Sequence, residues 1–186
     1  MYENDRDFIK KVKEIKNHWN GDIFGYTHET FLFWSDKMYF FSKIYHTTKP
    51  FDIIDITDDI KKFISDHACK DWLVNIFTRH TTAILKINEA EEWFRNDLKV
   101  WCDKNVSIDE IYRHNDLEHR DPKTMCKNKE ECLNGHAHIR GMLIGNTSET
   151  IPVHKWKLMF GRRQRVLLFE LDHAREREII FSFMGD

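Results

Sequence analysis

Three short segments of the 186-residue chain place histidines among small and polar side chains. Imidazole is the usual side chain for binding a transition metal or moving a proton near neutral pH. Neighbouring hydroxyls, amides and carboxylates are the groups that a small polar ligand needs. The three segments are His80-Thr81-Thr82, Tyr112-Arg113-His114-Asn115-Asp116 and Asn134-Gly135-His136-Ala137-His138.

One histidine from each segment would together make a three-histidine metal site, built from His80, His114 and His138. Such a site leaves a position open for water or a ligand. Zinc or another divalent metal is the predicted cofactor, because imidazole ligands suit zinc. Two alternatives remain: each histidine is a hydrogen-bonded structural residue, or the site transfers protons without a metal.

His136 and His138 lie two positions apart, and their relative direction depends on the local backbone. On a regular helix they project about 200° apart and cannot share an ion. In an extended segment before a helix they would point the same way. Only one of the two therefore faces a site if the helix already includes both.

Asn88 and Glu89 stand between a predicted strand and a predicted helix. Glu89 is either an acid at a helix start, favoured by the helix dipole, or the general acid/base of a site. Thr81 and Thr82 are ordinary strand residues by propensity. Beside His80, their hydroxyls could instead bind a phosphate group.

Charge and composition exclude several classes of protein. The formal net charge is −2, so no basic field indicates nucleic-acid binding. No apolar run reaches the roughly 18 residues of a membrane span, and Met1–Asp5 lacks a signal-peptide pattern, so we expect a cytoplasmic protein. Four cysteines without a CxxC pair favour reduced thiols, although a structural zinc at Cys126 and Cys132 is the alternative.

Hydrophobic periodicity predicts a single α+β domain with a mostly antiparallel sheet packed by a few helices. Thr57 is the expected N-cap of the second helix, and residues 115–133 form a long loop. The predicted helices span 5–18, 58–68, 89–101 and 137–144, with a single helical turn at 108–112. The predicted strands span 31–34, 39–48, 72–78, 83–87, 149–153, 157–160, 165–171 and 177–184.

Aromatic residues are abundant at 13%, which indicates a large core or an oligomer interface. In the helix predicted at 89–101, four apolar side chains recur at helical spacing and should face inward. They are Trp93, Phe94, Leu98 and Trp101.

The histidine segments, together with a turn and strand entry after the last helix, resemble the YjbQ-like family, often labelled secondary thiamine-phosphate synthase. That turn is Gly145-Asn146-Thr147-Ser148, followed by Ile151-Pro152-Val153. The resemblance covers Tyr39 to Gly185. It divides the chain into an N-terminal extension (1–37), with the amphipathic helix, and a YjbQ-like domain (38–186).

The chain departs from the family pattern in its last third. Gly161-Arg162-Arg163-Gln164 stands where the family usually has Gly-x-Trp-Gln. Trp156 replaces a frequent glycine, and His173-Ala174 replaces Gly-Pro. The loss of an aromatic platform at Arg163 weakens the transfer of a ligand-binding role to Gln164.

The resemblance implies a homotrimer with sites near subunit boundaries and makes His138, rather than His136, the site histidine. It implies Glu89 and His80 as catalytic residues of a weak thiamine-phosphate synthase, which joins a pyrimidine diphosphate to a thiazole phosphate and releases pyrophosphate. Ligand contacts would come from Thr81, Thr82, Asn88, Ser148, Gln164 and Arg175. For Ser148 a plain helix end, and for Arg175 a structural ion pair, are the alternatives.

Two classes of function follow. The first is a small cytosolic metal-binding enzyme that acts on a phosphorylated small molecule, with thiamine-phosphate synthase as a possible side activity. The second is a non-catalytic homo-oligomer that binds a metal or a metabolite. The chain lacks an evident acidic cluster for Mg²⁺, which a diphosphate leaving group would favour.

Overall fold

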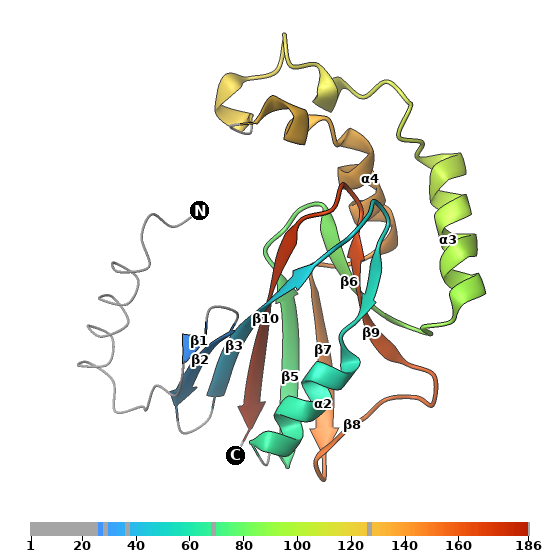
Figure 1. Ribbon diagram of the computed structural model, residues 1–186. Coiled ribbons are helices and arrows are strands. Elements are labelled where there is room, and N and C mark those ends of the chain that lie inside the picture. Colours follow the sequence, from blue (N-terminus) through green and yellow to red (C-terminus); the bar gives the residue numbers. More distant parts are fainter. Residues whose placement is uncertain (1–25, 28–29, 36–37, 68–69, 126–127, 186) are drawn as a thin grey trace.

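The computed structural model describes residues 26–27, 30–35, 38–67, 70–125 and 128–185 (Figure 1). The helix predicted at 5–18 and most of the N-terminal extension lie outside the described residues. Two strands of the extension, β1 (Tyr26–Thr27) and β2 (Thr30–Ser35), continue the main sheet. The strand predicted at 31–34 is thereby confirmed.

The main sheet has seven strands in the order β1-β2-β3-β10-β5-β7-β8, and all of its pairs are antiparallel. A smaller antiparallel sheet has the order β4-β9-β6. The predicted α+β fold is confirmed. The strands beyond β2 are β3 (Met38–His46), β4 (Ile53–Asp55), β5 (Asp71–Thr78), β6 (Ala83–Asn88), β7 (Ser148–His154), β8 (Lys157–Leu158), β9 (Arg165–Glu170) and β10 (Glu176–Gly185).

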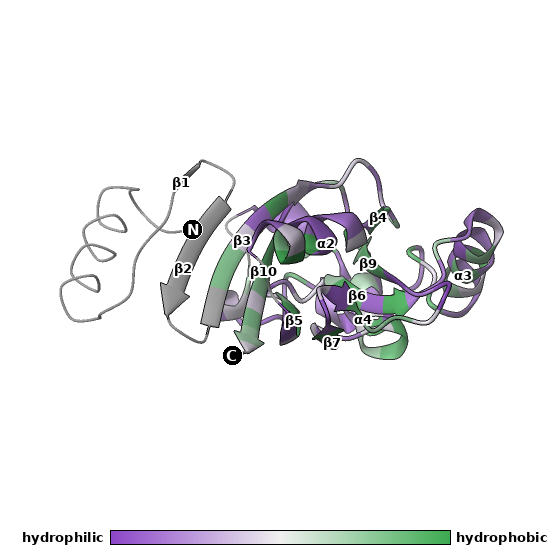
Figure 2. Ribbon diagram, turned by 90° about the horizontal axis from the view of Figure 1, so that it is seen from below, coloured by the Kyte–Doolittle hydropathy of each residue, from purple (hydrophilic) through white to green (hydrophobic). Residues whose placement is uncertain are grey.

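Strand β9 separates two layers of the core, because successive side chains on a strand point to opposite faces. Val166 and Leu168 join a cluster with the main sheet and with helix α2 (Thr57–Asp66). Leu167 and Phe169 face the other way, into a second cluster. That cluster includes residues of α3 (Glu92–Asn105) and α4 (Gly135–Ile144), which lie on the side of the small sheet away from the main sheet (Figures 1 and 2).

Helix α2 buries Ile60, Phe63 and Ile64, which lie on one face at helical spacing, but the predicted N-cap is wrong. The cap position is Ile56, and Thr57 is the first helical residue. The Thr57 hydroxyl accepts a hydrogen bond from the Val166 backbone N–H at 2.8 Å. A contact to β9 therefore replaces the local cap.

Helix α3 begins three residues later than predicted and packs differently. Glu91 is its N-cap, and its carboxylate accepts hydrogen bonds from the N–H groups of Trp93 and Phe94. Cys102 is the fully buried residue of the helix, whereas Trp93 is 76% and Trp101 47% exposed. The expectation that both tryptophans face inward is wrong within one chain, because little of this helix contacts the small sheet.

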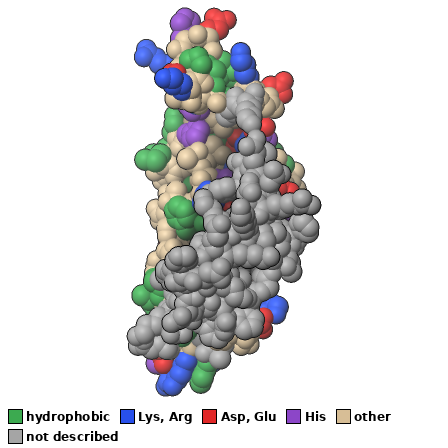
Figure 3. All heavy atoms as spheres, turned by 90° about the vertical axis from the view of Figure 1, so that its left-hand side faces the viewer, with side chains coloured by type: hydrophobic (Ala, Val, Ile, Leu, Met, Phe, Trp, Pro, Cys, Tyr) green, Lys and Arg blue, Asp and Glu red, His purple; other side chains and the backbone are tan. Residues whose placement is uncertain are grey.

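The segment between α3 and α4 consists mainly of irregular chain with three short 3₁₀ helices: η1 (Arg113–Asn115), η2 (Pro122–Thr124) and η3 (Lys129–Cys132). The long loop predicted at 115–133 is confirmed, while the helical turn predicted at 108–112 lies instead at η1. Histidine and charged side chains gather at this end of the molecule in the space-filling view (Figure 3).

Strand β10 and the end of β9 carry a buried ion pair between Arg177 and Glu170, which are 2% and 0% exposed. The guanidinium donates two hydrogen bonds to the carboxylate, one of them at 2.6 Å from Nε. Thr47 donates to the same carboxylate, and Thr82 accepts from Arg177. Glu170 lies on β9 of the small sheet and Arg177 on β10 of the main sheet, so this network ties the two sheets together.

Candidate functional site

Two of the predicted site histidines lie side by side. His114 stands on η1 and His138 on α4, with ring centroids 4.6 Å apart. Gly135 allows the close approach, because a Cβ there would lie 2.6 Å from the Cβ of Tyr112. The Gly135 backbone N–H also donates to the Asn115 side chain at 2.9 Å, which fixes η1 on the start of α4.

A chain of polar groups orients the His114 ring. The Asn134 amide nitrogen donates to the carboxylate of Asp172 at 3.0 Å and to the carbonyl of Glu131 at 3.0 Å. The Asn134 amide oxygen therefore faces His114 Nε2, at 3.1 Å. We infer that Nε2 carries the proton and donates it to Asn134, which leaves the lone pair of His114 on Nδ1. A histidine whose one nitrogen is held by a hydrogen bond in this way can bind a metal or a proton through the other nitrogen.

Arg120 packs against the same ring. One guanidinium nitrogen, Nη1, lies 3.0 Å from His114 Nε2 and 3.2 Å from the His114 carbonyl oxygen. With the proton on Nε2, this N–H donates to the carbonyl. Thr124 holds the rest of the guanidinium in place through its hydroxyl and its carbonyl.

Burial and neighbouring cations keep both rings neutral at neutral pH. Burial lowers the pKa of His114, and the Arg120 charge lowers it further. Burial, and to a smaller extent the proximity of His114, also lowers the pKa of His138. Burial alone would raise the pKa of Asp172, but hydrogen bonds from Asn134 and His173 outweigh it and keep that carboxyl ionised. Neutral imidazoles backed by a carboxylate can ligate a metal or accept a proton.

An open hollow of about 630 Å³ adjoins His114. Two arginines, Arg113 and Arg120, line it with Asp116 and His119. Asp116 already contacts His119, with its oxygen 2.9 Å from Nδ1. The arginines give this hollow a surplus of positive charge, which suits an anionic group.

His80 lies apart, on the connection between β5 and β6. Its Nε2 accepts a hydrogen bond from the Glu178 backbone N–H at 3.0 Å, so Nδ1 carries the proton. Burial, and then the charge of Arg177, lowers the pKa of this ring. Among the described residues of one chain, no group of three or more His, Cys, Asp or Glu is arranged to hold a metal ion.

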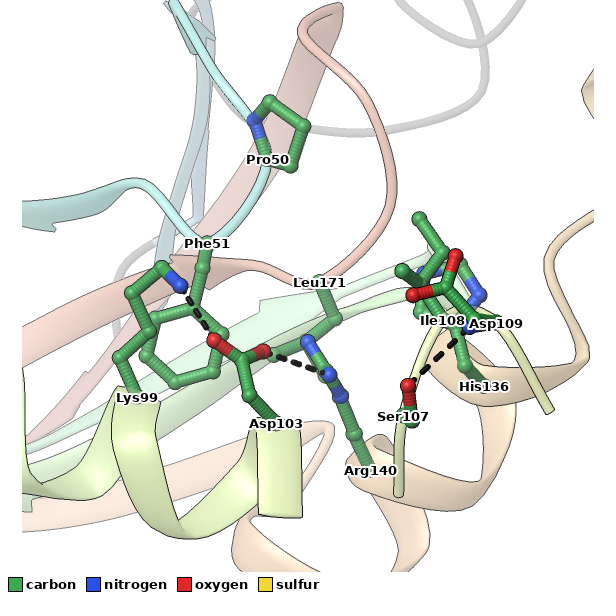
Figure 4. A pocket seen from close by; sticks show the side chains of 10 residues that line it. All are labelled: Pro50, Phe51, Lys99, Asp103, Ser107, Ile108, Asp109, His136, Arg140 and Leu171. Carbon is green, nitrogen blue, oxygen red and sulfur yellow. Dashed lines mark hydrogen bonds and ion pairs between the residues drawn. The ribbon is translucent and has the colours of Figure 1, made fainter. Parts of the chain in front are cut away.

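His136 faces away from the His114–His138 pair. His136 and His138 both lie in the first turn of α4. His136 lines a different pocket, together with Arg140 (Figure 4). Both histidines are on the helix, so the helical alternative for their directions holds.

Thr82 and Arg175 contact groups of the interior, whereas Thr81 does not. Thr82 is buried and accepts a hydrogen bond from Arg177, whereas Thr81 is exposed. Arg175 donates to Asp172 at 2.9 Å, so it supports the carboxylate behind Asn134. This contact is an ion pair of the kind given above as the structural alternative for Arg175.

Asn88 and Glu89 lie at the far end of β6 from His80. The strand extends about 16 Å from Ala83 to Asn88, at about 3.3 Å per residue. The Glu89 carboxylate pairs with Arg163 at 2.9 Å, while Asn88 accepts from the Glu89 N–H. Residues close in sequence are therefore separated within one chain.

The two remaining predicted contacts also have local partners. The Gln164 side-chain oxygen accepts from the Gly161 N–H at 2.7 Å. Ser148 accepts from Asn75 at 2.6 Å. Neither contact excludes a ligand, and neither brings these residues to the histidine pair.

Sequence reasoning missed Arg120, Asn134 and Asp172 as parts of the site. Asp172 follows an apolar strand, and a carboxylate there requires polar partners if it is buried. That requirement is a usable signal, but it does not identify Asn134, which is 38 positions away in sequence.

The described residues thus form a small α+β domain with a histidine pair at the junction of a 3₁₀ turn and a helix. A family model described as "UPF0047 protein YjbQ-like" matches residues 42–186. A UPF0047 protein of Archaeoglobus fulgidus is 34% identical over 134 residues, which cover 72% of this chain and 92% of that protein. Another, from Methanocaldococcus jannaschii, is 34% identical over 140 residues, covering 75% and 90%.

Solved structures show the same fold. A YbjQ-like protein of unknown function from Sulfolobus solfataricus P2 has a TM-score of 0.68 at 27% identity, covering 81% of this chain and 99% of that chain. A YjbQ/UPF0047 protein from Clostridium acetobutylicum has a TM-score of 0.63 at 28% identity, covering 75% and 96%. The chain belongs to the UPF0047, YjbQ-like family. Strands β1 and β2 precede the matched residues, and no helix in the described part of the chain is long and apolar enough to cross a membrane.

Proposed function

We propose that this protein binds a divalent metal, zinc in preference, through His114 and His138, and that it acts on a phosphorylated small molecule. The observation that carries the proposal is the adjacent pair of neutral imidazoles, 4.6 Å apart between centroids. Asn134 and Asp172 direct the His114 lone pair to Nδ1. Imidazole donors of this kind suit zinc.

His114 and His138 supply part of the ligand set that a metal ion needs. Two histidines of one chain supply two ligands, and a zinc site needs one or two more from water, the ligand or a neighbouring subunit. His80 fits less well as a ligand, since its Nε2 accepts the Glu178 N–H. Of the two roles predicted for His80, we propose proton transfer or hydrogen-bond donation through Nδ1.

The arginines beside His114 support an anionic ligand. Arg113 and Arg120 line the open hollow, and guanidinium groups bind phosphate oxygens in pairs of hydrogen bonds. A bound metal would add charge for the same oxygens. The transfer implied by the family resemblance, loss of pyrophosphate from a pyrimidine diphosphate, requires such neutralisation of the leaving group. Glu89 remains the proposed acid/base, in its ion pair with Arg163.

Metal analysis of purified variants tests the site. We expect His114→Ala and His138→Ala each to weaken zinc binding at least tenfold, because each removes a ligand. His80→Ala should retain the metal and lose ligand response. His154→Ala is the matched control, since His154 is exposed and contacts Asp71 on another strand. Elemental analysis with competition against a chelator reports the affinity, and wild-type metal retention in both His114→Ala and His138→Ala would refute the site.

Turnover distinguishes the two classes of function. The metal-loaded protein is incubated with the pyrimidine diphosphate and the thiazole phosphate, and pyrophosphate release is measured. Release that depends on His80 and Glu89 supports the enzyme. Thermal stabilisation by these compounds without release supports the alternative, a non-catalytic metabolite-binding protein.

We also propose a homotrimer. Large apolar side chains on α3, on α4 and between them are exposed in one chain, and such side chains are enriched where subunits meet. They include Trp93, Trp101, Ile111, Ile139, Met142 and Leu143. Contact between copies would cover the tryptophans and could bring residues of a second copy to the histidine pair.

Light scattering at micromolar concentration should report about three subunits. Met142→Asp should dissociate the assembly, because it places a charge among these apolar side chains. Met159→Asp is the control, since Met159 is also exposed but lies on the connection after β8. A wild-type protein that stays monomeric would contradict the proposal.

A further inference from the structure

The end of the main sheet that carries β8 exposes a row of apolar side chains, far from the 3₁₀ helices and the histidine pair (Figure 1). Met184 on β10 is paired with Leu73 on β5, and Leu73 with Pro152 on β7. Met159, directly after β8, donates its backbone N–H to the Pro152 carbonyl oxygen at 2.9 Å. The exposed fractions of Met184, Leu73 and Met159 are 37%, 44% and 57%, and Pro152 is also exposed.

The row lies on the outer face of the sheet. Its neighbours along the strands, Val153 and Phe183, are buried in the cluster that includes helix α2. Successive side chains of a strand point to opposite faces, so the row points away from this cluster. The solvated face of an antiparallel sheet usually carries polar side chains. A row of exposed apolar side chains there indicates a surface that meets a partner.

The connection between β7 and β8 adds an exposed tryptophan. It consists of Lys155 and Trp156, which have φ values of 48° and 62°. A two-residue connection with positive φ favours glycine or asparagine, because a bulky side chain is strained there. The Trp156 N–H donates to the Lys70 carbonyl oxygen at 3.1 Å, and the Lys155 N–H donates to the Asp71 carboxylate at 3.2 Å. A tryptophan held in a strained turn with 52% of its surface exposed points to a function for the indole.

Three exposed lysines surround this indole. Lys155 and Lys157 flank it in sequence, and the Lys70 Nζ lies 5.8 Å from the ring centroid. None of the three ammonium groups forms an ion pair with a described residue. Asp71, the carboxylate beside them, is already engaged by His154 at 2.5 Å. This end of the sheet therefore has a surplus of positive charge.

Apolar side chains, an exposed indole and unpaired lysines together match an anionic lipid surface. Tryptophan is enriched at the level of the lipid headgroups, because its ring is apolar and its N–H is polar. Side chains such as Leu73 and Met159 are stabilised when they leave water at the boundary with the acyl chains. A single-stranded nucleic acid fits less well, since these two side chains neither stack on bases nor bind phosphate, and such proteins usually offer a groove with several aromatic rings.

We propose that this end of the main sheet docks on an anionic lipid bilayer, with the apolar side chains in the interfacial layer and the lysines on the headgroups. Docking of this kind is peripheral and requires no membrane-spanning helix. It uses none of the groups of the proposed metal site, so its failure would leave the proposed function unaffected. The docking surface consists of Leu73, Pro152, Trp156, Met159 and Met184, with Lys70, Lys155 and Lys157.

Sedimentation with lipid vesicles tests the proposal. The full chain is incubated with vesicles of phosphatidylcholine alone or of phosphatidylcholine mixed with phosphatidylserine. We expect at least tenfold tighter binding to the vesicles that contain phosphatidylserine, because each lysine near an anionic surface adds to the attraction. Higher ionic strength should weaken this binding. An oligodeoxythymidylate at equal phosphate concentration should not displace the protein from the vesicles.

Two variants test the apolar part of the docking surface. Trp156→Gly removes the indole and also relieves the left-handed strain, so it should be at least as stable as wild type. It should nevertheless weaken binding to phosphatidylserine vesicles at least tenfold. Met159→Asp places a carboxylate in the apolar row and should weaken the same binding while light scattering reports an unchanged assembly.

A charge-neutralising pair of substitutions tests the lysines. Lys155→Gln combined with Lys157→Gln should abolish the preference for phosphatidylserine. The matched control combines Lys123→Gln with Lys129→Gln, which removes two exposed lysines from η2 and η3 and should bind as wild type does.

Four results would overturn the proposal. They are wild-type protein that does not sediment with phosphatidylserine vesicles, equal binding to phosphatidylcholine alone, displacement by the oligonucleotide, and normal vesicle binding by the folded Trp156→Gly variant. Circular dichroism and urea unfolding of each variant show that it is folded.

Discussion

Replacing Arg177 by methionine is expected to lower the free energy of unfolding by about 3–5 kcal/mol. The change would leave the Glu170 carboxylate fully buried without the cation that donates two hydrogen bonds to it. The Thr47 hydroxyl and the Asp172 backbone N–H would still donate to Glu170, but neither carries a charge. A buried ion that loses its counter-ion is among the most destabilising results of a single substitution.

Urea unfolding at neutral pH, followed by circular dichroism, measures this effect. Glu178→Gln is the matched control, because it disrupts an exposed Arg–Glu pair with Arg79 and should cost less than about 1 kcal/mol. Glu170→Leu combined with Arg177→Met removes both charges and should recover part of the loss. Equal stability of Arg177→Met and wild type would mean that the pair contributes little.

Acidification below about pH 6.5 is expected to destabilise the metal-free protein. Burial, the first cause in each case, lowers the pKa of four histidines in the folded state. The unfolded chain, in which a histidine titrates near 6.5, then binds more protons than the folded chain. Stability is therefore fully present above this value and falls as the pH drops toward the folded pKa values. The four residues are His80, His114, His136 and His138.

Urea unfolding at a series of pH values from 7.5 to 5 measures the slope. Each additional proton bound on unfolding contributes about 1.4 kcal/mol per pH unit. Carboxylates with lowered pKa values, such as Asp172, act in the same direction but only below about pH 4. His80→Gln should flatten the profile, while His154→Gln should not. A wild-type profile that is flat between pH 7 and 5 would contradict the assignment.

The strands could be predicted well because their signal is local. In β9, Val166 to Phe169 form an apolar run that fits a strand buried on both faces, as found. In β10, alternate residues such as Phe181 and Phe183 are buried, in agreement with the period of two. Helix ends were less predictable, since Thr57 uses its hydroxyl for a contact to β9 that no local pattern reveals.

The apolar side chains of α3 show a limit of periodicity. The spacing of Trp93 and Trp101 indicates a face that avoids water, but it does not identify what covers that face. Within one chain both side chains are exposed. The spacing of apolar residues thus predicts which face of a helix is hydrophobic. Which part of the protein, or which other subunit, covers that face depends on the position of the helix in the tertiary structure.

The sequence by itself determined the fold class, most strands and the candidate chemistry of the histidine segments, because propensity and periodicity act over a few residues. Only the tertiary structure decided which groups meet. It brought His114 to His138, placed Asn134 against Asp172, and separated Glu89 from His80 along an extended strand. It also placed His136 in the lining of a second pocket. The physical reason is that strand pairing and helix packing join residues far apart in sequence, whereas an extended backbone separates near ones.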